Sequence, residues 1–247
     1  EHSFPTRRSS DLKATSVPAI LGDEVFITHH ADQDGEVMES IAVLDLKTLG
    51  FLREFGARPA LHLDMQVQQA SHLKTAAMAY DAGNGFVGGA PEASGALEAE
   101  SNVGASNVSS LQSFMGSTII AFKNSLYTVM GDSLLSIDPQ DGTVRWGFHL
   151  DVDLKTLGGA AATAPVVSDD YVATVTTTGR AIICERKSGI LKHDLYVKAQ
   201  VRYPPIMHEG WLYVPTTEGE LVSWNTHDPG IMGWPMLMRD PAHHCDR

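Results

Sequence analysis

The sequence predicts an all-β protein made of several copies of one small antiparallel sheet. Three observations lead to this prediction. Segments of about 40 residues repeat along the chain, apolar residues alternate with polar ones inside each copy, and Gly, Asp and Asn separate the alternating runs. An alternation with a period of two is typical of strands, and the Gly- and Asp-rich breaks are typical of hairpin turns.

Two repeats in the second half of the chain align without a gap. They are residues 164–191, APVVSDDYVATVTTTGRAIICERKSGIL, and residues 204–230, PPIMHEGWLYVPTTEGELVSWNTHDPG. Pro165 aligns with Pro205, 40 positions later. Each repeat holds an apolar run, a turn, an alternating run, a Gly-containing turn and another apolar run. One copy therefore supplies three or four short antiparallel strands.

Two further copies lie closer to the N-terminus. Residues 125–146 read SLYTVMGDSLLSIDPQDGTVRW, in which residues 138–142 have the composition of a turn. A looser first copy begins near residue 17 and contains a polar insertion at residues 31–40. Tandem units of this length, which cannot bury both faces alone, are typical of β-propeller blades. The sequence therefore predicts an incomplete propeller of about four blades, which start near Val17, Ser117, Ala164 and Pro204.

The segments outside the repeats are assigned by composition and period. Spacings of three and four between apolar residues predict a helix of about four turns after residue 61, followed by a Gly- and Ala-rich loop. Residues 3–12, SFPTRRSSDL, resemble a translated sequencing adapter, so we expect a truncated bacterial or metagenomic fragment. The expected parts are a non-native tail (1–12), a first blade (13–60), a helical and loop insertion (61–112), three further blades (113–232) and a C-terminal tail (233–247).

Charge and composition exclude several classes of partner. Lys and Arg number 18 against 30 Asp and Glu, and the formal net charge of -12 repels phosphate backbones. We therefore expect no nucleic-acid partner. No apolar run approaches the roughly 18 residues that span a bilayer, so we expect no membrane span. The ligand or protein partner itself is left open by the sequence.

The repeats resemble those of a known family. The pattern of residues 164–189 and the sequence DPQDGTVRW that ends at Trp146 are similar to the pyrroloquinoline-quinone-type (PQQ-like) repeat of bacterial propellers in the quinoprotein and outer-membrane-assembly groups. Residues 233–243 also resemble a segment that accompanies such repeats in bacterial proteins. The resemblance implies a non-catalytic propeller that serves as a binding or assembly platform in the periplasm or cell envelope, or outside the cell.

The same resemblance leaves a PQQ-dependent quinoprotein dehydrogenase as the alternative. Enzymes of that group hold the quinone over a tryptophan, often beneath a disulfide between adjacent cysteines, with Ca²⁺ nearby. The two cysteines of this chain, Cys184 and Cys245, are not adjacent. We therefore expect no cofactor in this sequence, and PQQ with Ca²⁺ only under the alternative.

Candidate site residues follow from the topology of a propeller. The outermost strand of one blade connects to the innermost strand of the next across one face, near the central channel. Thr163, Arg202 and Tyr203 directly precede innermost strands, so they are predicted at the channel mouth. Arg202 is the candidate contact for an anion or a carboxylate. An ordinary solvated role for this arginine stays open.

Other residues of interest are predicted to be structural. His29-His30 and residues 243–245 have metal-ligand residue types, but adjacent strand residues point to opposite faces, so solvated turn and tail positions are favoured over a metal site. Trp146 and Trp211 are predicted to lock one blade to its neighbour. No G-x-S-x-G motif supports Ser-His-Asp catalysis.

Overall fold

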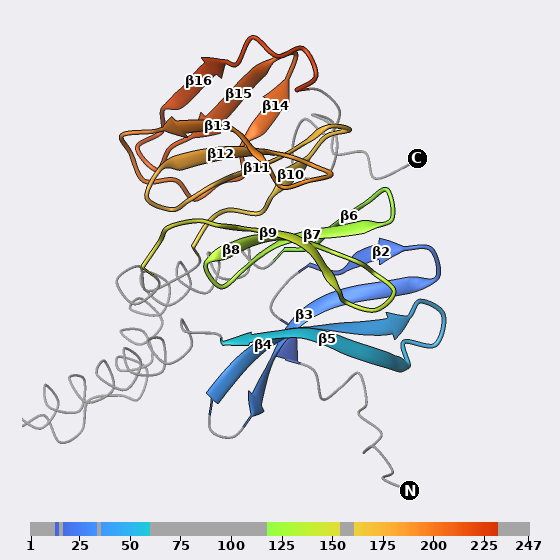
Figure 1. Ribbon diagram of the computed structural model, residues 1–247. Helices are drawn as coiled ribbons and strands as arrows, with labels where there is room; N and C mark the ends of the chain where they lie inside the picture. Colours follow the sequence, from blue (N-terminus) through green and yellow to red (C-terminus); the bar gives the residue numbers. More distant parts are fainter. Residues whose placement is uncertain (1–12, 15–16, 34–35, 60–117, 154–160, 232–247) are drawn as a thin grey trace, which may run out of the picture.

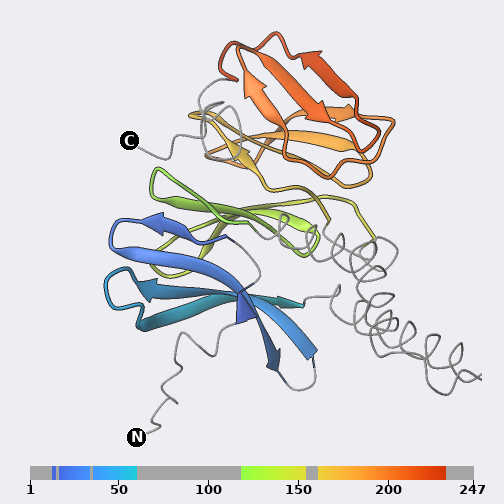
Figure 2. The ribbon, with the colours of Figure 1, turned by 180° about the vertical axis from the view of Figure 1, so that it is seen from behind.

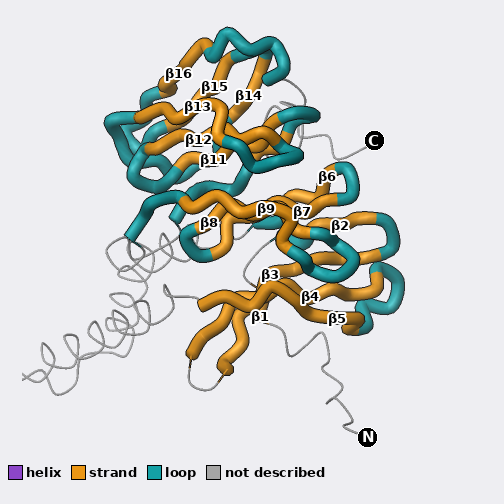
Figure 3. Tube along the Cα trace, viewed as in Figure 1, coloured by secondary structure: helices purple, strands orange, loops and turns teal. Residues whose placement is uncertain are grey.

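The computed structural model describes residues 13–14, 17–33, 36–59, 118–153 and 161–231. Every regular element in these ranges is a strand (Figure 3). The strands form four separate antiparallel sheets in chain order, and each sheet is one blade. The all-β prediction is confirmed.

Each blade consists of consecutive strands paired as hairpins. Blade 1 holds β1 (Lys13–Ala14), β2 (Ala19–Leu21), β3 (Glu24–Gln33), β4 (Glu36–Asp45) and β5 (Phe51–Pro59). Blade 2 holds β6 (Ile120–Phe122), β7 (Ser125–Met130), β8 (Ser133–Ile137) and β9 (Val144–His149). Blade 3 holds β10 (Val166–Val167), β11 (Tyr171–Val175), β12 (Arg180–Glu185) and β13 (Leu191–Tyr196). Blade 4 holds β14 (Ile206–His208), β15 (Trp211–Pro215) and β16 (Leu221–Asn225).

The four blades follow one another in an arc, with blades 1 and 4 at its opposite ends (Figures 1 and 2). The innermost strand of blade 2, β6, contacts the innermost strands β2 and β10 of its two neighbours. The described sheets therefore have the radial order of a propeller, and they do not close into a ring.

The polar stretch at residues 31–40 differs from the prediction. It is not an insertion between strands, because β3 and β4 run through it as one long hairpin with pairs from Glu24–Asp45 to Gln33–Glu36. Backbone pairing satisfies the N–H and C=O groups whatever the side chains are, so polar residues can continue a strand. The predicted insertion at 61–112 and both predicted tails lie outside the described residues.

Apolar side chains from neighbouring blades fill each interface. Between blades 2 and 3, the shared core includes Tyr127 and Leu134 on one side and Val172 and Ile182 on the other. Similar cores join blade 1 to blade 2 and blade 3 to blade 4. Burying one such side chain contributes about 1.5–3 kcal/mol. The stability of each blade therefore depends on its neighbours.

The predicted lock at Trp146 is confirmed. Its side chain on β9 is buried, and its Nε1 donates a hydrogen bond of 2.8 Å to the carbonyl of Arg186 in blade 3. Gly189, at φ 71°, lies so close to the indole that a Cβ there would be 2.7 Å from ring carbons. Gly142 of blade 2 packs in the same way on Phe55 of blade 1. In blades 2 and 3, the turn before the outer strand therefore docks on an aromatic ring of the preceding blade.

Trp211 does not lock two described blades together. It lies on β15, where Leu212 and Val214 belong to the core shared with blade 3. Successive strand residues point to opposite faces, so Trp211 faces away from blade 3. It is 37% exposed and stacks on Tyr213 with ring centroids 6.2 Å apart. The prediction for this tryptophan is wrong for the described blades.

Blades 3 and 4 are also joined by a hydrogen bond from the Tyr171 hydroxyl to Asp228 Oδ2. This bond raises the pKa of Tyr171 to about 12 and holds the pKa of Asp228 below its ordinary value of 3.8. Its stabilising effect is lost as the pH falls through the lowered pKa of the carboxyl group. The effect is also lost as the pH rises from the ordinary phenol pKa of 10.0 towards 12.

Tyr171→Phe is therefore expected to lower the free energy of unfolding by about 1 kcal/mol between pH 3.8 and pH 10.0, and by less on either side. Urea unfolding at a series of pH values measures this difference. Tyr196→Phe is the control, because Tyr196 on β13 is 66% exposed. A difference that stays the same at every pH would contradict the role of the hydrogen bond.

Candidate functional site

The connection from blade 3 to blade 4 carries two of the candidate residues and runs across one end of both blades. The N–H of Val201 donates to the carbonyl of Thr177 in the β11–β12 turn, at 3.3 Å. The carbonyl of Gln200 accepts from the N–H of Thr217 in the β15–β16 turn, at 3.0 Å. The connection is therefore held against a hairpin turn of each blade.

Arg202 and Tyr203 follow on this connection, shortly before β14. Arg202 is half-buried, and its Nε is buried with no hydrogen-bond partner in the described part of the chain. Tyr203 is 56% exposed. A buried guanidinium nitrogen without an acceptor costs free energy.

Thr163 lies in the matching place on the connection from blade 2 to blade 3, but it is 2% exposed. Its hydroxyl accepts a hydrogen bond from the N–H of Val175 at 3.3 Å. Its carbonyl accepts one from Thr174 Oγ1 at 2.8 Å. The polar groups of Thr163 are therefore engaged inside blade 3, whereas Arg202 and Tyr203 reach the surface.

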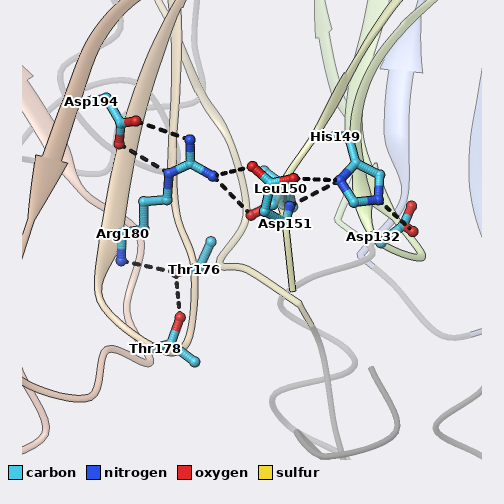
Figure 4. A network of polar contacts seen from close by, with 8 residues as sticks. All are labelled: Asp132, His149, Leu150, Asp151, Thr176, Thr178, Arg180 and Asp194. Carbon is cyan, nitrogen blue, oxygen red and sulfur yellow. Dashed lines mark hydrogen bonds and ion pairs between the residues drawn. The ribbon is translucent and has the colours of Figure 1, made fainter. Parts of the chain in front are cut away.

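A chain of polar contacts links blades 2 and 3 near the β11–β12 turn, and the sequence did not indicate it (Figure 4). The Arg180 guanidinium donates to both carboxylate oxygens of Asp194, at 3.0 and 2.9 Å, and to Asp151 Oδ2 at 2.8 Å. Asp151 donates its N–H to His149 Nδ1 at 3.0 Å, and His149 Nε2 lies 3.1 Å from Asp132 Oδ2. The contacts join the β7–β8 turn of blade 2 to the outer hairpin of blade 3.

These hydrogen bonds and ion pairs hold blade 2 and blade 3 together, and we call them the clamp. The hydrogen bonds from Arg180 lower the pKa of Asp194 and of Asp151, and they raise the pKa of Arg180. The two carboxylates are 44% and 70% exposed, so solvent screens each pair and its contribution is modest. The clamp holds the start of the connection between blades 2 and 3 in place.

His29 differs from the prediction of a solvated turn residue. It lies on β3, is 1% exposed, and its Nε2 is 3.2 Å from both Ser40 Oγ and Glu54 Oε1. Ser40 also donates to Glu54 at 2.5 Å. A Ser-His-acid relay needs the acid and the serine on different imidazole nitrogens. Because both groups meet the same nitrogen here, the cluster is a buried polar contact and not a catalytic triad.

Among the described residues there is neither a cluster of metal-ligating side chains nor a membrane-spanning helix. In these ranges, no three His, Cys, Asp or Glu side chains gather in a way that could hold a metal ion. The same part of the chain contains no helix with the length and apolar character needed to cross a membrane.

The chain is similar to a known family and to several solved structures. Residues 130–242 match the family described as outer membrane protein assembly factor BamB. No curated protein matches the sequence. The computationally designed protein Ika4 is 13% identical with a TM-score of 0.50, over 87% of this chain and 91% of Ika4. The designed protein Ika8 is 12% identical with a TM-score of 0.50, over 86% of this chain and 45% of Ika8.

BamB from Moraxella catarrhalis is 11% identical to this chain, with a TM-score of 0.46. The similarity covers 85% of this chain and 42% of the BamB chain. At such identities, structural similarity concerns the fold alone. The family match covers the repeats of blades 3 and 4 that first suggested the architecture, and the four sheets have the expected strand order. The described blades have the arrangement of a β-propeller, and the part of the chain at residues 130–242 is similar to PQQ-like repeats.

Proposed function

We propose that this chain is a non-catalytic binding or assembly platform that works in the bacterial envelope. The observation that carries the proposal is the match of residues 130–242 to the family described as an outer membrane protein assembly factor. A propeller of hairpins suits this task, because the blades form a rigid scaffold and the connections between blades present side chains at its ends.

The proposed contact with the ligand is Arg202, supported by Tyr203. The buried Nε of Arg202 has no acceptor in the described part of the chain, and a guanidinium can donate two parallel hydrogen bonds to a carboxylate. Tyr203 offers an exposed ring beside it. We therefore assign a carboxylate group as the ligand chemistry, carried either by a protein segment or by a small molecule.

The proposal includes no cofactor. Cys184 lies on β12 in the core between blades 2 and 3, and burial raises the pKa of its thiol to about 12. Trp146 is held between the same two blades by its bond to Arg186. These positions do not fit the cysteine pair and the open tryptophan surface of a quinone site. An absorption spectrum after addition of PQQ and Ca²⁺ to the chain is expected to show no bound-quinone band, and such a band would favour the dehydrogenase instead.

Arg202→Ala is expected to weaken carboxylate binding about tenfold or more. The measurement is calorimetric titration with a short acetylated peptide that ends in Glu-Glu, at low salt, next to the matching amidated Gln-Gln peptide. Arg145→Ala is the matched control, because Arg145 pairs with Asp138 at a blade turn and its side chain is 37% exposed. Equal binding of the Glu-Glu peptide by wild type and Arg202→Ala would remove Arg202 from the site.

A further inference from the structure

The connections on the two sides of blade 3 are held by the same backbone contact. Between blades 2 and 3, the carbonyl of Ala161 accepts a hydrogen bond from the N–H of Thr177 at 3.1 Å. Between blades 3 and 4, the carbonyl of Gln200 accepts one from the N–H of Thr217 at 3.0 Å. Ala161 and Gln200 therefore occupy equivalent positions, and the side chains of the two connections can be compared one by one.

The side chains that follow these two positions differ in size and charge. Thr163, two residues after Ala161, is buried, and its polar groups are engaged inside blade 3. Arg202, two residues after Gln200, is half-buried. Since a small neutral residue is enough at this position in one connection, the fold does not require an arginine in the other.

A second cation lies on the connection between blades 3 and 4. Lys198 is exposed and precedes Arg202 by four residues. Within the described ranges, the side chains of Lys198 and Arg202 form no hydrogen bond or ion pair with another residue. Arg53, Arg145 and Arg180, by contrast, each pair with a carboxylate. Two unpaired cations on one segment of a chain with a net charge of -12 are available to an acidic partner.

The backbone between the two cations is held in place by the neighbouring turn of blade 3. Val197 donates its N–H to the carbonyl of Gly179 at 2.7 Å, and Val201 donates to that of Thr177 at 3.3 Å. A Cβ at position 179 would lie 2.3 Å from the carbonyl oxygen of Val197 and 2.6 Å from that of Ala199, so the close approach requires glycine. A segment that is already ordered loses little backbone freedom when a ligand binds.

The spacing of the two cations fits two carboxylates on one extended segment. The α-carbons of Lys198 and Arg202 are four residues apart and therefore separated by no more than about 14 Å. Alternate side chains of an extended peptide lie on the same side, about 7 Å apart. The long side chains of lysine and arginine can bridge the difference, so both carboxylates can be contacted at once.

We propose that the partner is an acidic segment of another protein, which binds along this connection with one carboxylate on Arg202 and a second on Lys198. This inference rests on the proposed function and selects a protein segment over a small monocarboxylate. The Arg202 guanidinium can bind its carboxylate with two parallel hydrogen bonds, whereas Lys198 contributes a point charge. A ligand with one carboxylate would leave Lys198 unpaired.

Calorimetric titration at low salt tests the proposal with two blocked peptides, acetyl-Glu-Gly-Glu-amide with two carboxylates and acetyl-Gln-Gly-Glu-amide with one. The wild-type chain is expected to bind the first peptide at least about fivefold more tightly. Lys198→Gln is expected to reduce this ratio to about twofold, the advantage of carrying two carboxylates instead of one, and to leave binding of the second peptide unchanged. Lys187→Gln is the matched control, because Lys187 is exposed on the turn between β12 and β13, at the other end of blade 3.

The outcomes distinguish this inference from the function on which it rests. A wild-type chain that binds neither peptide would contradict the proposed function itself. If Arg202→Ala loses binding but Lys198→Gln matches the wild type with both peptides, the contact at Arg202 stands and the acidic segment is wrong. Glutarate, a free dicarboxylate, is the third ligand to titrate. Glutarate that binds as tightly as the peptide with two carboxylates would assign the site to a small molecule and overturn the inference.

Discussion

Replacement of Trp146 with alanine is expected to lower the free energy of unfolding by about 3–5 kcal/mol. The indole is buried between blades 2 and 3, where it packs with Tyr127 and is covered by Gly189. Its loss leaves a cavity that neighbouring strands cannot fill without shifting. The substitution also removes the donor to the Arg186 carbonyl and leaves that acceptor unsatisfied.

Urea unfolding followed by circular dichroism measures this cost. Tyr196→Ala is the control, because Tyr196 is also an aromatic residue on an outer strand but is 66% exposed, and its loss is expected to cost less than about 1 kcal/mol. Trp146→Phe keeps one six-membered ring but removes the N–H donor and part of the buried ring system, so its cost is expected to lie between those of Trp146→Ala and Tyr196→Ala. Similar costs for Trp146→Ala and Tyr196→Ala would show that the indole does not hold the blades together.

The blades could be predicted from the sequence because their signals are local. A strand such as Tyr171–Val175 alternates over a few residues, and the turn at Gly189 follows at a fixed distance. The hydrophobic pattern predicts strand positions and burial less well where polar residues continue a strand or are buried. His29 looked like a solvated residue because its partners Ser40 and Glu54 are brought to it only by strand pairing.

The sequence predicted that Arg202 lies on a connection between blades, whereas its role as a ligand contact stays a prediction. The order of strands in a propeller put Arg202 on a connection between blades, and the burial of its Nε depends on how that connection lies against two hairpin turns. The clamp of Arg180 was missed for a similar reason. Its partners Asp194 and Asp151 come from a neighbouring strand and from another blade, so no spacing in the sequence indicates them.

Gly189→Ala is expected to cost about 3 kcal/mol, nearly as much as the loss of the indole that this glycine covers. At φ 71°, alanine is strained by about 1 kcal/mol, and its Cβ would lie 2.7 Å from Trp146 ring carbons. Gly131→Ala separates the two effects, because Gly131 has φ 60° and no atom within 4 Å of an added Cβ. This control is expected to cost only the strain, about 1 kcal/mol.

The clash with the indole can be isolated in a double-mutant cycle measured by urea unfolding. In a Trp146→Ala background, the three atoms nearest to the added Cβ of Gly189→Ala are absent, so its cost should fall from about 3 towards about 1 kcal/mol, the value for Gly131→Ala. A cost that stays near 3 kcal/mol would place the strain in the turn itself. The cost of Gly189→Ala is expected to fall because Gly189 of blade 3 packs directly on the indole of blade 2. Once the indole is removed, the added Cβ no longer clashes with it.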